Sequence, residues 1–110
     1  MILSQDGNIY IITQEKATII ELVKKIEALY PKFKNNNVIV NLTSLGEIKS
    51  NEVVEFLQIS KTHRNTNQSF VIVSNKVNLD DTLDELIIVP TLQEAYDIIE
   101  MEDMERDLGL

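Results

Sequence analysis

The chain has 110 residues, with 18 acidic and 10 basic side chains, a formal charge of −8, no Cys and a single His. This composition excludes disulfides, thiolate zinc sites and any metal site that needs two imidazoles, and it argues against phosphate-dependent binding of nucleic acid. The chain also lacks an apolar run long enough to cross a bilayer and lacks the pattern of a secretory signal. These features predict one cytoplasmic domain over 1–110, with no membrane or nucleic-acid partner.

The N-terminal segment predicts a β-hairpin. Two apolar stretches, 1–3 and 9–13, flank the polar stretch 4–8. That polar stretch contains Asp6-Gly7, a strong hairpin signal because both residue types tolerate positive φ.

The next segment predicts an amphipathic helix. Its apolar residues recur every three or four positions between Ile19 and Phe33, which is the period of one helix face. Thr13 is expected to cap this helix at its N-terminus. Pro31 cannot donate a backbone hydrogen bond, so we expect it to mark the helix end.

A buried strand, a loop and a second helix are predicted next. Residues 38–42 are apolar with little alternation, as expected for a central strand covered on both faces. Residues 43–49 form a connecting loop, after which Ser50 or Asn51 is expected to cap a helix. The residues expected to point inward from that helix are Val53, Val54, Phe56, Leu57 and Ile59.

The remaining segments continue the alternation of strands and helices. Residues 69–74 predict a buried strand, 78–85 a short acidic helix or turn, and 86–89 a last strand. Thr91 and Glu94 form a capping box that opens the final helix. The inner face of this helix is predicted to consist of Leu92, Ala95, Tyr96 and Ile99.

The C-terminal third is strongly acidic. Residues 80–110 contain 11 acidic side chains and one base, Arg106. This surface is either a solvated face or a means of attracting a basic partner. Within the extension 100–110, Met101, Met104 and Leu108 have helical spacing, so the segment extends the last helix, frays or docks on a partner.

The element order is therefore β-β-α-β-α-β-(α)-β-α. Strands that alternate with helices require crossover connections, and these give a mostly parallel sheet. The predicted fold class is α/β, a mostly parallel sheet with an N-terminal hairpin and three to four helices.

No set of residues points to catalysis. His63 is the only histidine, and its place in the last turn of a helix beside Arg64 is explained by the helix dipole. The acids within 80–85 lack the ligand pattern of a calcium loop, and the three glycines form no phosphate-binding loop. We therefore expect a binding protein without metal or cofactor, rather than an enzyme.

Residues 38–52 resemble the central signature of the STAS domain, named for sulfate transporters and anti-sigma factor antagonists. Asn41-Leu42-Thr43 stands in place of the family triplet D-L-S, and Leu45 and Ile48 occupy the two buried anchor positions. Residues 49–52, Lys-Ser-Asn-Glu, stand in place of D-S-S-G.

Two downstream segments also resemble the family. Residues 70–73 look like the next family strand, and 89–95 are similar to the closing motif F-P-T-x-x-E-A. The order and spacing of these segments agree with a STAS-like domain over nearly the whole chain.

The resemblance implies a non-enzymatic regulatory protein whose partner is another protein, such as an anti-sigma factor or a serine kinase of the GHKL type. In bacterial anti-sigma factor antagonists, phosphorylation of a Ser in D-S-S-G breaks this complex. Asn51 occupies that position, while Ser50, one place earlier, is either a displaced phosphoacceptor or only a helix cap. The predicted partner-binding residues are Gly46, Glu47, Lys49, Ser50, Asn51, Glu52 and Val54.

Two other functions stay open at this point. The same scaffold serves a small-molecule or lipid carrier if an apolar cavity lies beneath its helices. An enzyme would require His63 to meet carboxylates, for example those within 80–85, in a cleft. The sequence does not fix the oligomeric state.

Overall fold

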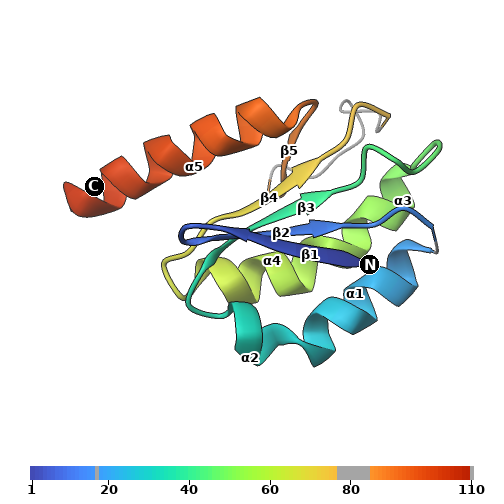
Figure 1. The fold of residues 1–110 in the computed structure, drawn as a ribbon, viewed down its shortest axis with the longest axis horizontal. Helices are drawn as coiled ribbons and strands as arrows, with labels where there is room; N and C mark the ends of the chain where they lie inside the picture. The colour runs from blue at the N-terminus through green and yellow to red at the C-terminus, as the bar shows by residue number, and fades with distance from the viewer. Residues whose placement is uncertain (17, 77–84, 110) are drawn as a thin grey trace.

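The computed structural model describes residues 1–16, 18–76 and 85–109, arranged around one five-stranded sheet (Figure 1). β1 is antiparallel to β2, whereas the pairs β2–β3, β3–β4 and β4–β5 are parallel. The predicted α/β fold with an N-terminal hairpin is therefore confirmed. The strands, in their order across the sheet, are β1 (Ile2–Asp6), β2 (Ile9–Thr13), β3 (Asn37–Asn41), β4 (Phe70–Val73) and β5 (Ile87–Val89).

The hairpin turn is tighter than the predicted stretch 4–8. β1 continues through Asp6, so only Gly7 and Asn8 lie between the two strands. Gly7 has a φ of 58°, which glycine adopts without the steric cost that a side chain would add. The polar residues of 4–6 are tolerated in a strand because β1 is the edge of the sheet and they face solvent.

The first predicted helix is divided into α1 (Ile19–Ala28) and α2 (Tyr30–Phe33). The prediction that Pro31 ends the helix is wrong. Pro31 lies in the first turn of α2, where a backbone N–H has no partner within the helix. The helix is interrupted before Pro31, at Leu29.

The cap of α1 also differs from the prediction. Thr13 is the last residue of β2, where it pairs with Asn41 of β3. The cap is Thr18, whose hydroxyl accepts a hydrogen bond from the Glu21 backbone N–H at 3.2 Å. A Thr can lie in a strand or cap a helix, and its pairing with β3 places Thr13 in the strand.

The second predicted helix is a continuous run of α3 (Ser50–Val53), the 3-10 turn η1 (Val54–Phe56) and α4 (Leu57–Arg64). Four of its five predicted inward residues are buried or half-buried, namely Val53, Phe56, Leu57 and Ile59. The assignment of Val54 to the inner face is wrong, because its side chain is 39% exposed. Val54 falls outside the buried stripe that Val53 and Phe56 define.

The last helix, α5 (Leu92–Asp107), begins at the predicted cap. The Thr91 hydroxyl accepts a hydrogen bond from the Glu94 backbone N–H at 3.2 Å. The helix continues through most of the acidic segment 100–110, so this segment extends the helix. The predicted helix or turn over 78–85 lies almost entirely outside the described residues.

The sheet separates two apolar cores, because side chains alternate between its faces. α1, α2 and α4 cover one face and α5 covers the other (Figure 1). The sheet residues of the first core include Val38, Val40, Phe70 and Ile72, and those of the second include Ile39, Val71 and Val73.

A polar cluster joins the end of α5 to the start of β3 and β4. The Asn37 side chain is buried, its Oδ1 accepts a hydrogen bond from the Ser69 backbone N–H at 2.7 Å, and its amide donates to Asp103 at 3.2 Å. Arg106 pairs with Asp103 and also donates to Ser69 Oγ at 3.1 Å. These contacts hold the C-terminal half of α5 against the sheet.

The two faces of α5 make different contributions to stability. We expect Ile99→Ala to lower the free energy of unfolding by about 2–5 kcal/mol, because Ile99 is buried in the second core. Met104→Ala on the same helix is the matched control, with an expected change within about 0.5 kcal/mol because this side chain is exposed. Urea denaturation followed by circular dichroism measures both, and equal losses would contradict the assignment of the two faces.

Candidate functional site

The predicted partner-binding residues lie together where the chain leaves the carboxyl end of β3 and enters α3. Ser50 is the first residue of α3, and Glu52 is half-buried in its first turn. The exposed members of the predicted set are Gly46, Glu47, Lys49, Asn51 and Val54. We call residues Gly46–Val54 the helix-entrance surface.

Apolar anchors at both ends hold the loop 43–49 in place. Leu42 and Ile48 are fully buried in the first core, and Leu45 packs against it while half-buried. The two predicted anchor positions, Leu45 and Ile48, therefore both face the core. Because Leu42 and Ile48 fix the two ends of the loop, the polar residues between them face solvent.

Asn41 fixes the start of this loop by local hydrogen bonds. Its Oδ1 accepts from the Thr43 backbone N–H at 3.1 Å and from the Thr43 hydroxyl at 2.8 Å. Asn and Asp both stabilise turns in this way, because a side-chain oxygen satisfies a backbone donor two residues on. Asn41 therefore holds the first residues of the loop in a turn.

Lys76 is a further part of the site, and no sequence pattern points to it. Its ammonium group donates to the carbonyl oxygen of Leu45 at 2.7 Å and to that of Thr43 at 3.2 Å. Lys76 follows β4, which is parallel to β3, so the chain segments after both strands leave the same edge of the sheet. Only this topology brings Lys76 to a loop more than 30 residues away in sequence.

The start of α3 is not capped as predicted. The helix already begins at Ser50, so Asn51 lies inside its first turn. The Glu52 carboxylate accepts a hydrogen bond from the Lys49 backbone N–H at 3.1 Å, which is the contact made by the third residue of a capping box. Glu52 thus stabilises the helix start.

A groove of about 260 Å³ lies between the start of α1 and the helix-entrance surface. Ile20 stands at this groove with a side chain that is 53% exposed. Ile20 lies next to Ile19 and off the buried stripe of α1, which is the sequence signal that could have identified it. The residues that line the groove are Thr18, Ile19, Ile20, Asn51, Glu52 and Glu55.

The groove has little in common with the cavity of a carrier. Most of its lining side chains are exposed, and Ile19 is the one lining residue that belongs to an apolar core. A second groove, on α5, also lies at the surface. Neither groove favours the alternative function of a small-molecule or lipid carrier.

His63 is a buried structural residue, contrary to the explanation by the helix dipole. Its Nε2 is 2.6 Å from the Asn36 carbonyl oxygen, and its Nδ1 is 2.9 Å from the Tyr30 hydroxyl. Because a carbonyl oxygen only accepts, Nε2 carries the proton and Nδ1 accepts from Tyr30 in the neutral ring. Burial lowers the pKa of His63 and so favours the neutral ring. Both ring nitrogens are occupied by the hydrogen bonds to Asn36 and Tyr30.

Two kinds of feature are absent from residues 1–16, 18–76 and 85–109. Within these ranges, no group of three or more His, Asp or Glu side chains is placed to hold a metal ion. In the same part of the chain, no helix is both long enough and apolar enough to cross a membrane.

The Lys76 contacts generate a prediction about loop order. We expect Lys76→Met to increase the fast backbone motion of residues 43–46, because two carbonyl oxygens lose their charged donor. The measurement is 15N relaxation, with Lys61→Met as a control that removes an exposed lysine from α4. Unchanged order parameters in Lys76→Met would show that the loop does not depend on this lysine.

The burial of His63 generates a prediction about pH. The unfolded chain binds a proton at His63 below about pH 6.5, whereas the lowered pKa keeps the folded ring neutral. The free energy of unfolding should therefore be highest above that pH and decrease as the pH falls toward 5.5, by at most about 1.4 kcal/mol per pH unit for one proton. His63→Gln should show a weaker decrease in urea titrations, and an equal decrease would contradict the assignment.

No protein-family model matches this chain, and no curated protein sequence matches it. Among solved structures, it is similar to a chain from the stressosome, which is described as a signal integration and transduction hub. The TM-score is 0.63, the identity is 13%, and the match covers 89% of this chain and 95% of the stressosome chain. The chain therefore shares the fold of a stressosome component, which agrees with the STAS-like architecture predicted above.

Proposed function

We propose that this chain is a cytoplasmic regulatory protein that acts by binding another protein through the helix-entrance surface. The observation that carries the proposal is the exposure of five of the predicted residues, next to a loop whose ends are anchored in the core: Gly46, Glu47, Lys49, Asn51 and Val54. The fold match to a protein of a signal-transduction assembly supports a regulatory role. The resemblance to anti-sigma factor antagonists points to an anti-sigma factor or a serine kinase-like protein as the partner.

The chemistry of the surface fits a protein partner. Ile20 and Val54 supply exposed apolar area on α1 and η1, two elements in contact, and Asn51 and Glu55 line the same groove as Ile20. Protein interfaces typically combine exposed apolar side chains with polar ones. Because the loop is already held by Leu42, Ile48 and Lys76, little conformational entropy is lost on binding.

Ser50 is our proposed phosphorylation site. It is the first residue of α3, and its neighbours along the chain include Glu47 and Glu52. A phosphate would add nearly two negative charges to the middle of the proposed interface. Such a change would alter both the charge and the shape that a partner meets, and would thereby weaken the complex.

The proposed surface is tested with the double variant Asn51→Arg/Val54→Asp. Both side chains are exposed, and the net charge of the protein stays the same. A partner captured from the native cytosol is identified, purified and titrated by calorimetry against wild type and variant. We expect the variant to bind at least about tenfold more weakly, which is the usual loss when central interface residues are replaced.

The matched control is Asn35→Arg/Asn65→Asp. These exposed residues lie in turns before β3 and after α4, at the amino ends of β3 and β4. The helix-entrance surface, in contrast, follows the carboxyl end of β3. The control should bind as tightly as wild type. If both double variants bind like wild type, the partner uses another surface and the proposal is wrong.

Phosphorylation is tested separately by intact-mass measurement of the protein isolated from its own cells. The proposal expects a species heavier by one phosphate, which fragmentation maps to Ser50 and which Ser50→Ala lacks. A phosphate on another residue, or its absence under every growth condition tested, would refute the role of Ser50 without affecting the binding surface.

A further inference from the structure

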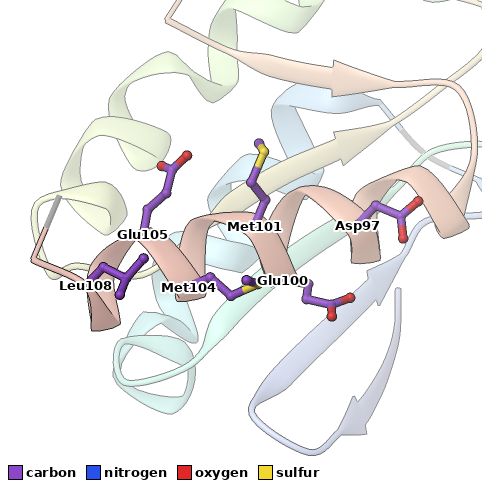
Figure 2. A pocket seen from close by; sticks show the side chains of 6 residues that line it. All are labelled: Asp97, Glu100, Met101, Met104, Glu105 and Leu108. Atoms are coloured by element: carbon purple, nitrogen blue, oxygen red, sulfur yellow. The ribbon is translucent and has the colours of Figure 1, made fainter.

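A second surface lies on the side of the sheet opposite the helix-entrance surface. The outer face of α5 carries Met101, Met104 and Leu108 with exposed fractions of 50%, 59% and 72%. They recur at steps of three and four and therefore form one stripe along the helix. Figure 2 shows these side chains with Asp97, Glu100 and Glu105, which together line a groove of about 310 Å³.

Packing within this chain does not explain the stripe. The inner face of α5 already supplies Ala95 and Ile99 to the second core, and Leu92 and Tyr96 pack against that core. All six residues that line the groove belong to α5, so no other described element forms part of it. Unbranched Met side chains adapt to different apolar partners and are frequent on surfaces that bind helices.

The charges around the stripe identify the kind of partner. α5 contains seven acidic residues and one base, Arg106. Arg106 pairs with Asp103 and Arg64 with Glu102, both away from the stripe. In the part of the chain that the structure describes, no ion pair involves Asp97, Glu100 or Glu105. The apolar stripe is therefore bordered by acids alone.

We propose that the outer face of α5 binds a basic amphipathic helix of a partner protein. Such a helix places apolar residues on Met101, Met104 and Leu108 and its Lys or Arg residues beside the acids. A second copy of α5 is a poor occupant, because acids would face acids across the contact. The same repulsion disfavours nucleic acid and anionic lipid.

The test uses a synthetic helix of Leu and Lys, patterned so that all Leu residues lie on one face, and labelled for fluorescence anisotropy. We expect saturable binding to wild type that weakens as salt is raised. A scrambled peptide of the same composition, which has no apolar face, should not bind. Equal binding of both peptides would overturn the proposal, as would no binding of the patterned peptide.

Three variants locate the binding site. Met101→Gln/Met104→Gln and Glu100→Gln/Glu105→Gln should each weaken binding by about tenfold, and the second should also reduce the dependence on salt. Ile20→Gln, which changes an exposed apolar residue on the other side of the sheet, is the control and should bind like wild type. Wild-type affinity in both α5 variants would overturn the proposal.

Two further measurements separate this proposal from its alternatives. Asn51→Arg/Val54→Asp should keep its affinity for the peptide, so that failure of one surface is distinguishable from failure of the other. Sedimentation equilibrium should show no self-association that depends on Met101 and Met104. A dimer that Met101→Gln/Met104→Gln dissolves would overturn the proposal in favour of a second copy as the occupant.

Discussion

Most of this architecture follows from the absence of a polar face on β3 and β4. Residues 38–40 and 70–73 are buried on both sides of the sheet, and parallel strands of this kind must be covered by helices on both faces. The run from α1 to α4 covers one face, so α5 must cover the other. The exposed surface is thereby left to the loops at the ends of the strands and to the outward sides of the helices.

The two surfaces that result differ in how they are built. The helix-entrance surface is a short loop and helix start, given its shape by buried Leu42 and Ile48 and by the Lys76 ammonium group. The outer face of α5 is one regular helix whose position depends on the second core and on the cluster around Asn37. The sheet lies between the two surfaces.

The sequence predicts those features that a short stretch of chain determines by itself. Hydrophobic period revealed the strands and the inner face of α5, and the Thr91 cap needed only its own helix. Features that depend on distant segments escaped prediction, among them the Lys76 contacts and the burial of His63 against Tyr30. In the candidate site, the position of the surface was predicted, but Ile20 and the role of Glu52 were not, because both depend on how α1 and α3 meet.

The contact between Asn37 and the Ser69 backbone affects the register in which β3 pairs with β4. In most sheets, a shift of one residue exposes apolar side chains and buries polar ones, and this penalty sets the alignment of strands. A strand that is apolar on both sides lacks that penalty, since a shifted β3 would still bury Val, Ile and Val. The buried amide of Asn37 restores it, because its oxygen meets the Ser69 N–H in one alignment only. A single polar residue at the strand entrance thus specifies the pairing that the apolar residues stabilise.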